Sequence, residues 1–183
     1  VIAGQVPIGA LGADAFQEVD LVGLAQPISK WSYQIRHAED IAWAVSRAFY
    51  IARSGRPGPV VLDFPKNAQT EDVEFVPQKV DYVRSYVAYP KLNKEAVAEA
   101  ARMINEAKRP LALVGQGVEL GHAQQELLNF LEKTDIPAGR TMLGLSALPS
   151  NHPLNVGMLG MHGNYAVNLQ AQECDVLIAI GMR

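Results

Sequence analysis

Three glycine-bearing segments in the second half of the chain have the composition of phosphate-binding loops. They are Gly115-Gln116-Gly117, Thr141 to Gly144, and Gly157 to Gly163. Glycine lets a ligand approach the backbone closely, and free backbone N–H groups bind phosphate. We expect all three at the carboxyl ends of strands and therefore on one sheet edge, together with Gly181 at the tip of the last strand. We interpret this edge as a nucleotide site, with tight turns as the alternative for any one segment.

The usual dinucleotide fingerprint is absent. Gly121 comes one residue late for Gly-x-Gly-x-x-Gly, and no acidic residue follows at the spacing that binds a ribose. Ordinary NAD binding is therefore disfavoured. The third segment contains Met158-Leu159-Gly160-Met161-His162-Gly163, and its polarisable methionines suit a flat aromatic surface such as a flavin ring, with a buried loop as the alternative. His162 can donate a hydrogen bond to a ligand, but no carboxylate or serine stands at a triad spacing, so we do not interpret it as a catalytic base.

Composition excludes several classes of protein. A net charge of -3 offers no basic face to nucleic acid or anionic lipid, so the expected partner is a small molecule or another protein. No apolar run reaches the roughly 20 residues that span a bilayer, and no leader peptide opens the chain. The single cysteine, Cys174, excludes an internal disulfide and a cysteine-based zinc site, and we expect a buried thiol. These features fit a reducing, cytoplasm-like compartment.

Helical and strand patterns alternate along the chain. An apolar stripe of Ile41, Ala44, Val45, Ala48, Phe49 and Ala52 predicts a helix that Gly55 ends, and a second stripe of Ala96, Val97, Ala100, Ala101 and Ile104 predicts another, with Asn93 as its N-cap. The remaining predicted elements are strands at 1–4, 59–62, 111–114, 136–138 and 176–180 and helices at 122–133 and 165–172. Short connections between them predict an α/β fold with open parallel sheets, covered by helices on both faces in the second part.

Residues 67–91 lack helical periodicity and predict a linker between two partial domains, 1–66 and 92–183. Its tyrosines and Phe75 indicate that the linker lies on the protein surface, because a disordered linker has few aromatic residues. The chain opens and closes on buried-strand patterns, so we expect it to be a segment of a longer protein.

Four motifs in order resemble the large catalytic subunit of acetolactate synthase, also called acetohydroxyacid synthase. They are Gly4 to Pro7, Gly12 to Glu18, Ser54 to Lys66, and Met158 to Gly163. The resemblance runs the whole length of the chain. It implies that residues 1–66 are the back part of a thiamine diphosphate pyrimidine-binding domain. It also implies that residues 92–183 are the front part of a Rossmann-like central domain that binds FAD.

That family is a group of thiamine diphosphate enzymes that decarboxylate pyruvate and join the two-carbon unit to a second 2-keto acid, pyruvate or 2-ketobutyrate, in branched-chain amino acid biosynthesis. No amino-acid side chain supplies the electron sink that this reaction needs, so a cofactor carries the chemistry. The resemblance also implies Mg²⁺ and FAD, a dimer or tetramer, a possible small regulatory subunit and, for a bacterial-type enzyme, the cytoplasm.

Site residues follow from matching motif positions. The resemblance places Gln17 as a polar contact and Phe16 as an apolar wall beside the thiazolium and the reacting keto acid. Val6, Pro7, Ala15, Lys66 and Met161 would line the substrate channel, where Lys66 would attract anionic keto acids, a solvated surface lysine being the alternative. The implied flavin contacts are Arg56, Gly115, Gln116, Gly117, Thr141, Met142, Leu159, Gly160, Met161, His162, Gly181, Met182 and Arg183. No metal ligand is implied within this chain.

The chain departs from the family pattern at Gln116, where a small residue is usual, at Ala13, where Thr is common, and at Trp31-Ser32, where His-Asn is common. The glutamate that activates the cofactor and the motif that holds magnesium and diphosphate are not among these residues. We therefore expect no synthase activity and only weak FAD binding from this polypeptide alone. Two alternatives stay open. One is a related enzyme, such as pyruvate oxidase, glyoxylate carboligase or an oxalyl-CoA type decarboxylase, against which residues 14–18 and Pro65-Lys66 favour the synthase. The other is a non-catalytic nucleotide-binding module.

Overall fold

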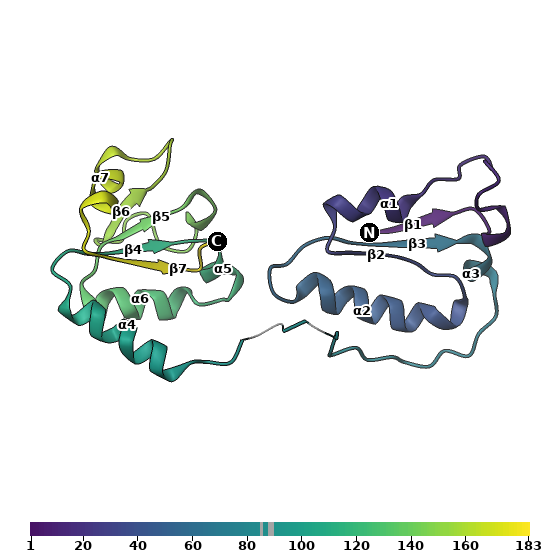
Figure 1. Ribbon diagram of the computed structural model, residues 1–183, viewed down its shortest axis with the longest axis horizontal. Coiled ribbons are helices and arrows are strands. Elements are labelled where there is room, and N and C mark those ends of the chain that lie inside the picture. Colours follow the sequence, from purple (N-terminus) through teal and green to yellow (C-terminus); the bar gives the residue numbers. More distant parts are fainter. Residues whose placement is uncertain (85, 88–89) are drawn as a thin grey trace. The chain divides into compact units, whose positions relative to one another are not determined.

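A computed structural model describes residues 1–84, 86–87 and 90–183. The chain divides into two compact units, Val1–Lys91 and Leu92–Arg183, each with its own parallel sheet (Figure 1). Within the described residues, no helix combines the length and the apolar character needed to cross a membrane.

The first unit is a three-stranded sheet between helices. Its strands are β1 (Ile2–Gln5), β2 (Trp31–Gln34) and β3 (Val60–Pro65), all parallel in the order β1-β3-β2. The helices α1 (Leu21–Ala25) and α2 (Ile41–Arg53) lie on opposite faces of the sheet, and α3 (Lys66–Thr70) follows β3 directly (Figure 1). Three 3-10 turns occur at Ile8–Ala10, Gln26–Ile28 and Ala38–Asp40.

Helix α2 packs on β3 through the predicted apolar stripe, with one exception. Ala44 and Ala48 are buried against Val60 and Leu62. Phe49, which the stripe also includes, is 66% exposed, because the small alanines rather than the aromatic ring meet the sheet. The helix ends where predicted, since Gly55 has a φ of 57°, a left-handed conformation that glycine adopts without strain.

The segment after β3 begins with a helix rather than a linker. Residues 67–70, expected as linker, belong to α3, and positions 85, 88 and 89 lie outside the described residues. Farther along, the chain contacts α2: the Val80 N–H donates to the Ser46 hydroxyl at 2.9 Å, and the Tyr86 ring meets the Tyr50 ring edge-on at 6.5 Å. These described parts of the segment therefore lie on the protein surface.

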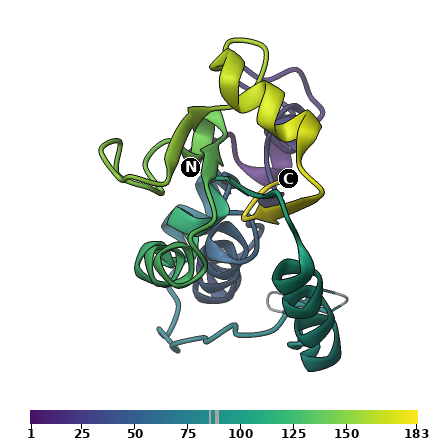
Figure 2. The same cartoon turned by 90° about the vertical axis from the view of Figure 1, so that its left-hand side faces the viewer.

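The second unit is a four-stranded parallel sheet. Its strands are β4 (Pro110–Val114), β5 (Ala138–Arg140), β6 (Asn155–Met158) and β7 (Val176–Ile180), in the order β6-β5-β4-β7. Figures 1 and 2 place α7 (Tyr165–Glu173) on one face and α4 (Lys94–Glu106) and α6 (Gln124–Thr134) on the other. The short elements α5 (Gly117–Leu120) and a 3-10 turn at Met142–Gly144 follow β4 and β5. Two open parallel sheets confirm the predicted α/β fold class.

Three strands of the structure were predicted only in part or not at all. β6 lies partly inside the stretch interpreted as a glycine loop, β5 begins at Ala138 where the predicted strand ended, and β2 was not predicted. β6 has little strand propensity of its own, and it pairs with β5 across a register shift between Ala138 and Gly139. Such a strand is stabilised by its neighbour rather than by its own sequence, so local pattern does not find it.

The apolar stripe of α4 is exposed. Asn93 caps the helix as predicted, because its side-chain oxygen accepts from the Ala96 N–H at 3.0 Å. Only Ile104, in the last turn, packs against the core, whereas Val97 is 54% exposed. The reason is that α6 covers this face of β4 through the buried Leu127 and Leu131.

Asp175, directly before β7, joins the amino end of this edge strand to the amino end of β4. Its carboxylate accepts from the backbone N–H groups of Lys108 and Arg109 at 2.7 and 2.8 Å. These two hydrogen bonds hold the pKa of Asp175 below its usual value. A carboxyl group whose pKa is lowered by folding stabilises the fold above its unfolded pKa, and this contribution is lost as pH falls through the folded pKa.

We therefore predict that Asp175→Asn removes part of the acid sensitivity of the second unit. Urea unfolding of wild type and variant between about pH 2 and pH 7 should show a stability difference that is largest above about pH 4 and shrinks below it. Asp135→Asn, at the left-handed C-cap of α6, is the control. Equal pH profiles for wild type and Asp175→Asn would contradict the role of this carboxylate.

Candidate functional site

The carboxyl edge of the first sheet brings three predicted channel residues together. Gln5 of β1 is opposite Pro65 of β3, so Val6 and Pro7 emerge beside Lys66. A hydrogen bond from the Ile8 N–H to the Asn67 side-chain oxygen, 3.2 Å, ties the two outgoing segments together. The Lys66 side chain is exposed, so its ammonium group is free to meet an anion.

Residues 12–18 form a loop beyond β1 that carries Ala15, Phe16 and Gln17. Phe16 is 90% exposed, and Gln17 has a left-handed φ of 68°. Gln5 anchors the end of the loop, because its side-chain amide donates to the Val19 carbonyl at 2.6 Å. Sequence reasoning identified the presented residues but missed Glu18, whose carboxylate accepts backbone hydrogen bonds inside the loop.

Arg56 lies away from these residues. It belongs to the exposed turn between α2 and β3, at the amino end of the strand, whereas Lys66 follows its carboxyl end. The first unit therefore separates Arg56, a predicted flavin contact, from the predicted channel.

The predicted flavin contacts of the second unit all follow carboxyl ends of strands. Because the four strands are parallel, their carboxyl ends share one edge, called here the glycine rim. The rim consists of Gly115, Gln116 and Gly117 after β4, Thr141, Met142 and Gly144 after β5, Leu159, Gly160, Met161 and His162 after β6, and Gly181, Met182 and Arg183 after β7. Backbone hydrogen bonds connect neighbouring segments, from Thr141 to Val114 and from Leu159 to Arg140, both at 2.9 Å.

Close backbone packing explains most of the rim glycines. A Cβ on Gly117 would stand 2.7 Å from Gly181 Cα, one on Gly115 would stand 2.9 Å from the Gly181 carbonyl carbon, and one on Gly144 would stand 2.9 Å from Gly115 Cα. Gly160 differs, because a Cβ there would meet no heavy atom within 4 Å. The first three glycines thus allow the loops to pack closely, whereas Gly160 leaves open space beside its backbone.

Two side chains that sequence reasoning missed hold the rim segments. Asn168 of α7 accepts from the Gly160 N–H and donates to the Gly160 carbonyl, both at 3.0 Å. Arg140 is 7% exposed and donates to the carbonyls of Leu145 and Leu148 at 2.7 and 3.0 Å. The sequence did offer a signal for Arg140, because an arginine in a buried strand needs hydrogen-bond partners. Asn168 lies in an ordinary helical sequence and offered none.

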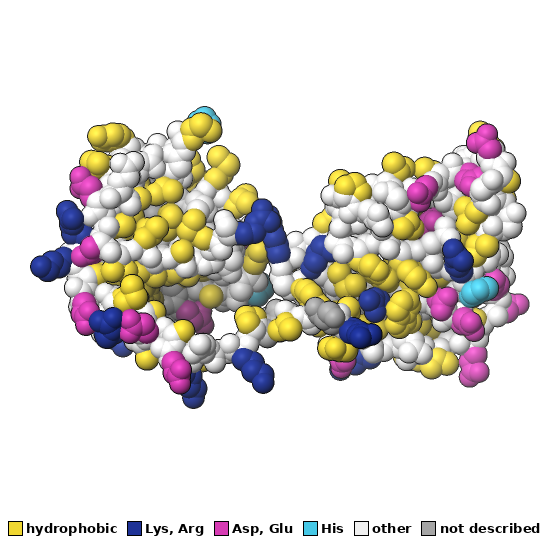
Figure 3. Space-filling view, in the orientation of Figure 1, with side chains coloured by type: hydrophobic (Ala, Val, Ile, Leu, Met, Phe, Trp, Pro, Cys, Tyr) yellow, Lys and Arg dark blue, Asp and Glu magenta, His cyan; other side chains and the backbone are white. Residues whose placement is uncertain are grey.

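Exposed apolar side chains accompany both edges. Met161 is 91% exposed and Met142 is 62% exposed on the rim, and hydrophobic side chains are visible on the surfaces of both units in Figure 3. Folding gains nothing from such residues, so they suit contact with an apolar ligand surface. Among the described residues, no group of three or more His, Cys, Asp or Glu side chains is placed to hold a metal ion.

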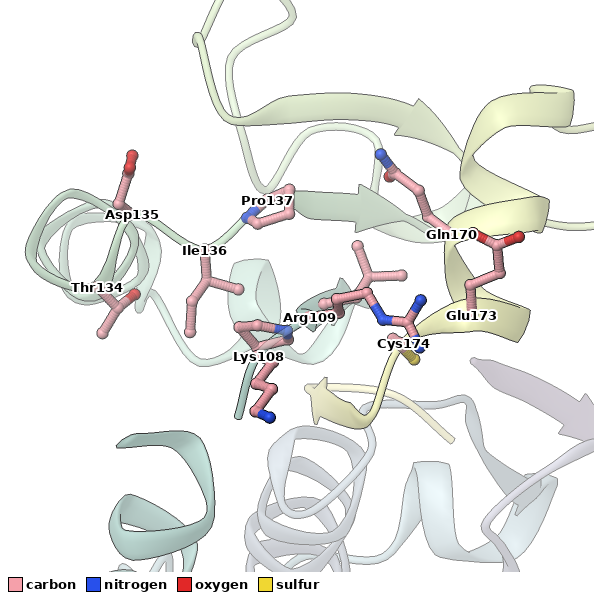
Figure 4. A pocket seen from close by; sticks show the side chains of 11 residues that line it. Lys108, Arg109, Thr134, Asp135, Ile136, Pro137, Gln170, Glu173 and Cys174 are labelled. Atoms are coloured by element: carbon pink, nitrogen blue, oxygen red, sulfur yellow. The ribbon is translucent and has the colours of Figure 1, made fainter. Parts of the chain in front are cut away.

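A cavity of about 400 Å³ lies at the other end of the second sheet (Figure 4). It is lined near the amino ends of β4 and β5 and the carboxyl ends of α6 and α7, by Lys108, Arg109, Pro110, Leu111, Thr134, Asp135, Ile136, Pro137, Gln170, Glu173 and Cys174. The Cys174 thiol, expected to be buried, is half-buried at this cavity and donates to the Ala171 carbonyl. No predicted site residue lines the cavity.

Comparison with known proteins shows what the chain is similar to. Residues 97–183 match the family model described as thiamine pyrophosphate enzyme, central domain. The chain is 44% identical over 182 residues to acetolactate synthase isozyme 1 large subunit of Escherichia coli, covering 100% of this chain and 32% of that protein. The second unit is therefore similar to the central domain of thiamine pyrophosphate enzymes.

Two further proteins show the same similarity. The chain is 43% identical to a probable acetolactate synthase large subunit of Methanocaldococcus jannaschii over 100% of this chain and 31% of that protein. A putative thiamin diphosphate-dependent enzyme from Mycobacterium smegmatis has a similar solved structure, with a TM-score of 0.75 and 27% identity over 97% of this chain and 34% of that one. The chain thus spans about a third of the length of these relatives.

The packing of the rim predicts a large effect from one methyl group. Gly117→Ala should destabilise the second unit by about 1–3 kcal/mol, because the β4 and β7 tips must separate to admit the Cβ. Thermal unfolding measures this, with Gly9→Ala as control, since a Cβ on Gly9 meets nothing within 4 Å. A neutral Gly117→Ala would show that the rim has room beside Gly181.

Proposed function

We propose that this chain is part of an acetolactate synthase large subunit, which decarboxylates pyruvate and joins the two-carbon unit to a second 2-keto acid, pyruvate or 2-ketobutyrate. The observation that carries the proposal is the placement of Val6, Pro7 and Lys66 at one sheet edge, in a chain 44% identical to such a subunit. Residues 1–66 then belong to the pyrimidine-binding domain, and residues 92–183 to the central domain.

The residues of the first unit act on the substrate in this proposal. Bound thiamine diphosphate supplies the electron sink for decarboxylation. Gln17 contacts the keto acid as a hydrogen-bonding group, and Phe16 forms an apolar wall that excludes water beside it. The exposed Lys66, with Val6 and Pro7 next to it, attracts the carboxylate of the incoming keto acid.

The glycine rim fits a flavin in this proposal. The open backbone at Gly160 admits a flat ring system, and the exposed Met142 and Met161 provide polarisable surfaces. Arg183 supplies a charge-assisted contact to pyrophosphate, which an apolar glycine loop lacks. FAD has no redox role in the net reaction. The packed glycines at 115 and 117 shape the rim rather than touch the ligand.

The remaining expectations belong to the whole enzyme. We propose that it requires Mg²⁺, assembles as a dimer or tetramer in the cytoplasm and binds a small regulatory subunit. In that assembly, Arg56 and Ala15 complete the flavin site and the channel. None of the residues described supplies a metal cluster, so we assign no magnesium ligand to this chain.

A different chemistry is also testable. A pyruvate oxidase on the same fold would consume oxygen, and a non-catalytic nucleotide-binding module would form no acetolactate. The full-length protein should convert pyruvate to acetolactate only with thiamine diphosphate and Mg²⁺ present, without oxygen uptake. Oxygen consumption that keeps pace with pyruvate loss would replace the synthase with the oxidase.

Lys66 provides the sharpest residue-level test. Lys66→Met in the full-length protein should lower kcat/KM for pyruvate by about tenfold to a hundredfold, mainly through KM, because a charge-assisted contact is lost. Lys79→Met is the matched control, since Lys79 is exposed and 3.7 Å from Asp81. Equal kinetics for the two variants would leave Lys66 an ordinary surface lysine.

A further inference from the structure

The loop that carries Phe16 and Gln17 has an unfavourable backbone. Gly12, Asp14 and Gln17 all adopt left-handed conformations, with φ of 80°, 55° and 68°. Glycine does so freely, but aspartate and glutamine are less stable in this conformation than in an ordinary one. A loop with this backbone persists only when other interactions hold it in place.

The Glu18 carboxylate supplies such interactions from inside the loop. One oxygen accepts from the Gly12 N–H, and the other accepts from the Ala15 N–H at 3.0 Å. The Glu18 N–H in turn donates to the Ala15 carbonyl at 2.9 Å, which closes a compact ring over residues 12–18. The two hydrogen bonds to the carboxylate lower the pKa of Glu18, so the carboxylate is ionised at neutral pH.

The ring exposes the Phe16 side chain rather than packing it into the core. Phe16 stands 90% exposed at its tip, so the ring contributes no apolar side chain from this position to the core of the first unit. Below the ring, Gln5 accepts from the Val6 N–H at 2.9 Å while donating to Val19, and this fixes the base of the loop to β1. The base and the tip are thus held by different side chains.

We propose that Glu18 is a positioning residue, whose carboxylate holds residues 12–18 in the shape that presents Phe16 and Gln17 to the keto acid. The part that concerns the keto acid rests on the proposed function. The part that concerns the loop does not, so the two are tested separately.

The loop is tested by amide hydrogen exchange of the 183-residue chain, measured by NMR. In Glu18→Gln one carboxylate oxygen becomes an NH₂ group, which cannot accept, so at least one of the Gly12 and Ala15 N–H groups loses its acceptor and should exchange about tenfold faster. The amides of β1 and β3 should be unchanged. Glu71→Gln is the matched control, because Glu71 accepts from the Ala38 N–H at 2.8 Å in a different part of the unit.

Two results would overturn the loop assignment. One is unchanged exchange at Gly12 and Ala15, and the other is faster exchange throughout the first unit, which would make Glu18 a general stabilising residue. If the variant does not fold, an NMR pH titration of the wild type tests the loop instead. The amide chemical shifts of Gly12 and Ala15 should then follow the chemical shift of the Glu18 carboxyl carbon, and not those of the Asp14 or Asp20 carboxyl carbons. Independent titration would contradict the ring.

The functional part is tested in the full-length enzyme. Glu18→Gln should lower kcat/KM for pyruvate by about tenfold with an unchanged thermal midpoint, and the loss should appear mainly in kcat because positioning acts on the reacting geometry. Glu74→Gln, at an exposed glutamate, is the control. Wild-type kinetics in Glu18→Gln would overturn positioning, whereas a wild-type protein that forms no acetolactate would overturn the proposed function and leave the exchange result intact.

Discussion

Parallel pairing of strands is the constraint on which both candidate edges depend. In the first unit, β1 and β3 run side by side, so the residues after Gln5 and Pro65 emerge together. In the second unit, four parallel strands deliver four loops to the glycine rim. Once the strands run parallel, backbone hydrogen bonding fixes this placement, because each strand must align with its neighbour to satisfy its N–H and C=O groups.

Glycine has two different roles in the glycine rim, close packing between loops and open space beside the backbone. Gly115, Gly117 and Gly144 stand where a Cβ would collide with neighbouring backbone, so they are required for the loops to pack at all. Gly160 stands in open space with a φ of 126°, which other residues rarely adopt. A ligand can therefore be invoked for Gly160, whereas the other three are already explained by the fold.

Much of the fold could be predicted from periodicity. The helix at 41–53 and the strand at 110–114 have strong patterns, and both are where the pattern placed them. β6 escaped because its pairing with β5 forms it, and the apolar stripe of α4 did not predict burial because α6 occupies that face of the sheet. Both failures arise from tertiary context, which overrides local propensity.

In the candidate site, the sequence predicted the residues that a loop presents but not the side chains that hold the loop in place. Matching motif positions gave a role to Phe16 and Gly160. They gave none to Glu18, which ends one of the motifs, or to Asn168, although these two side chains bind the backbone of those loops. One polar side chain within hydrogen-bonding distance is enough to hold a strained loop in place. Many residue types at many positions can provide such a side chain. Such side chains leave no periodic signal, so geometry is required to find them. A loop with several left-handed residues is nevertheless a reason to look for a clamp, since its backbone strain must be offset nearby.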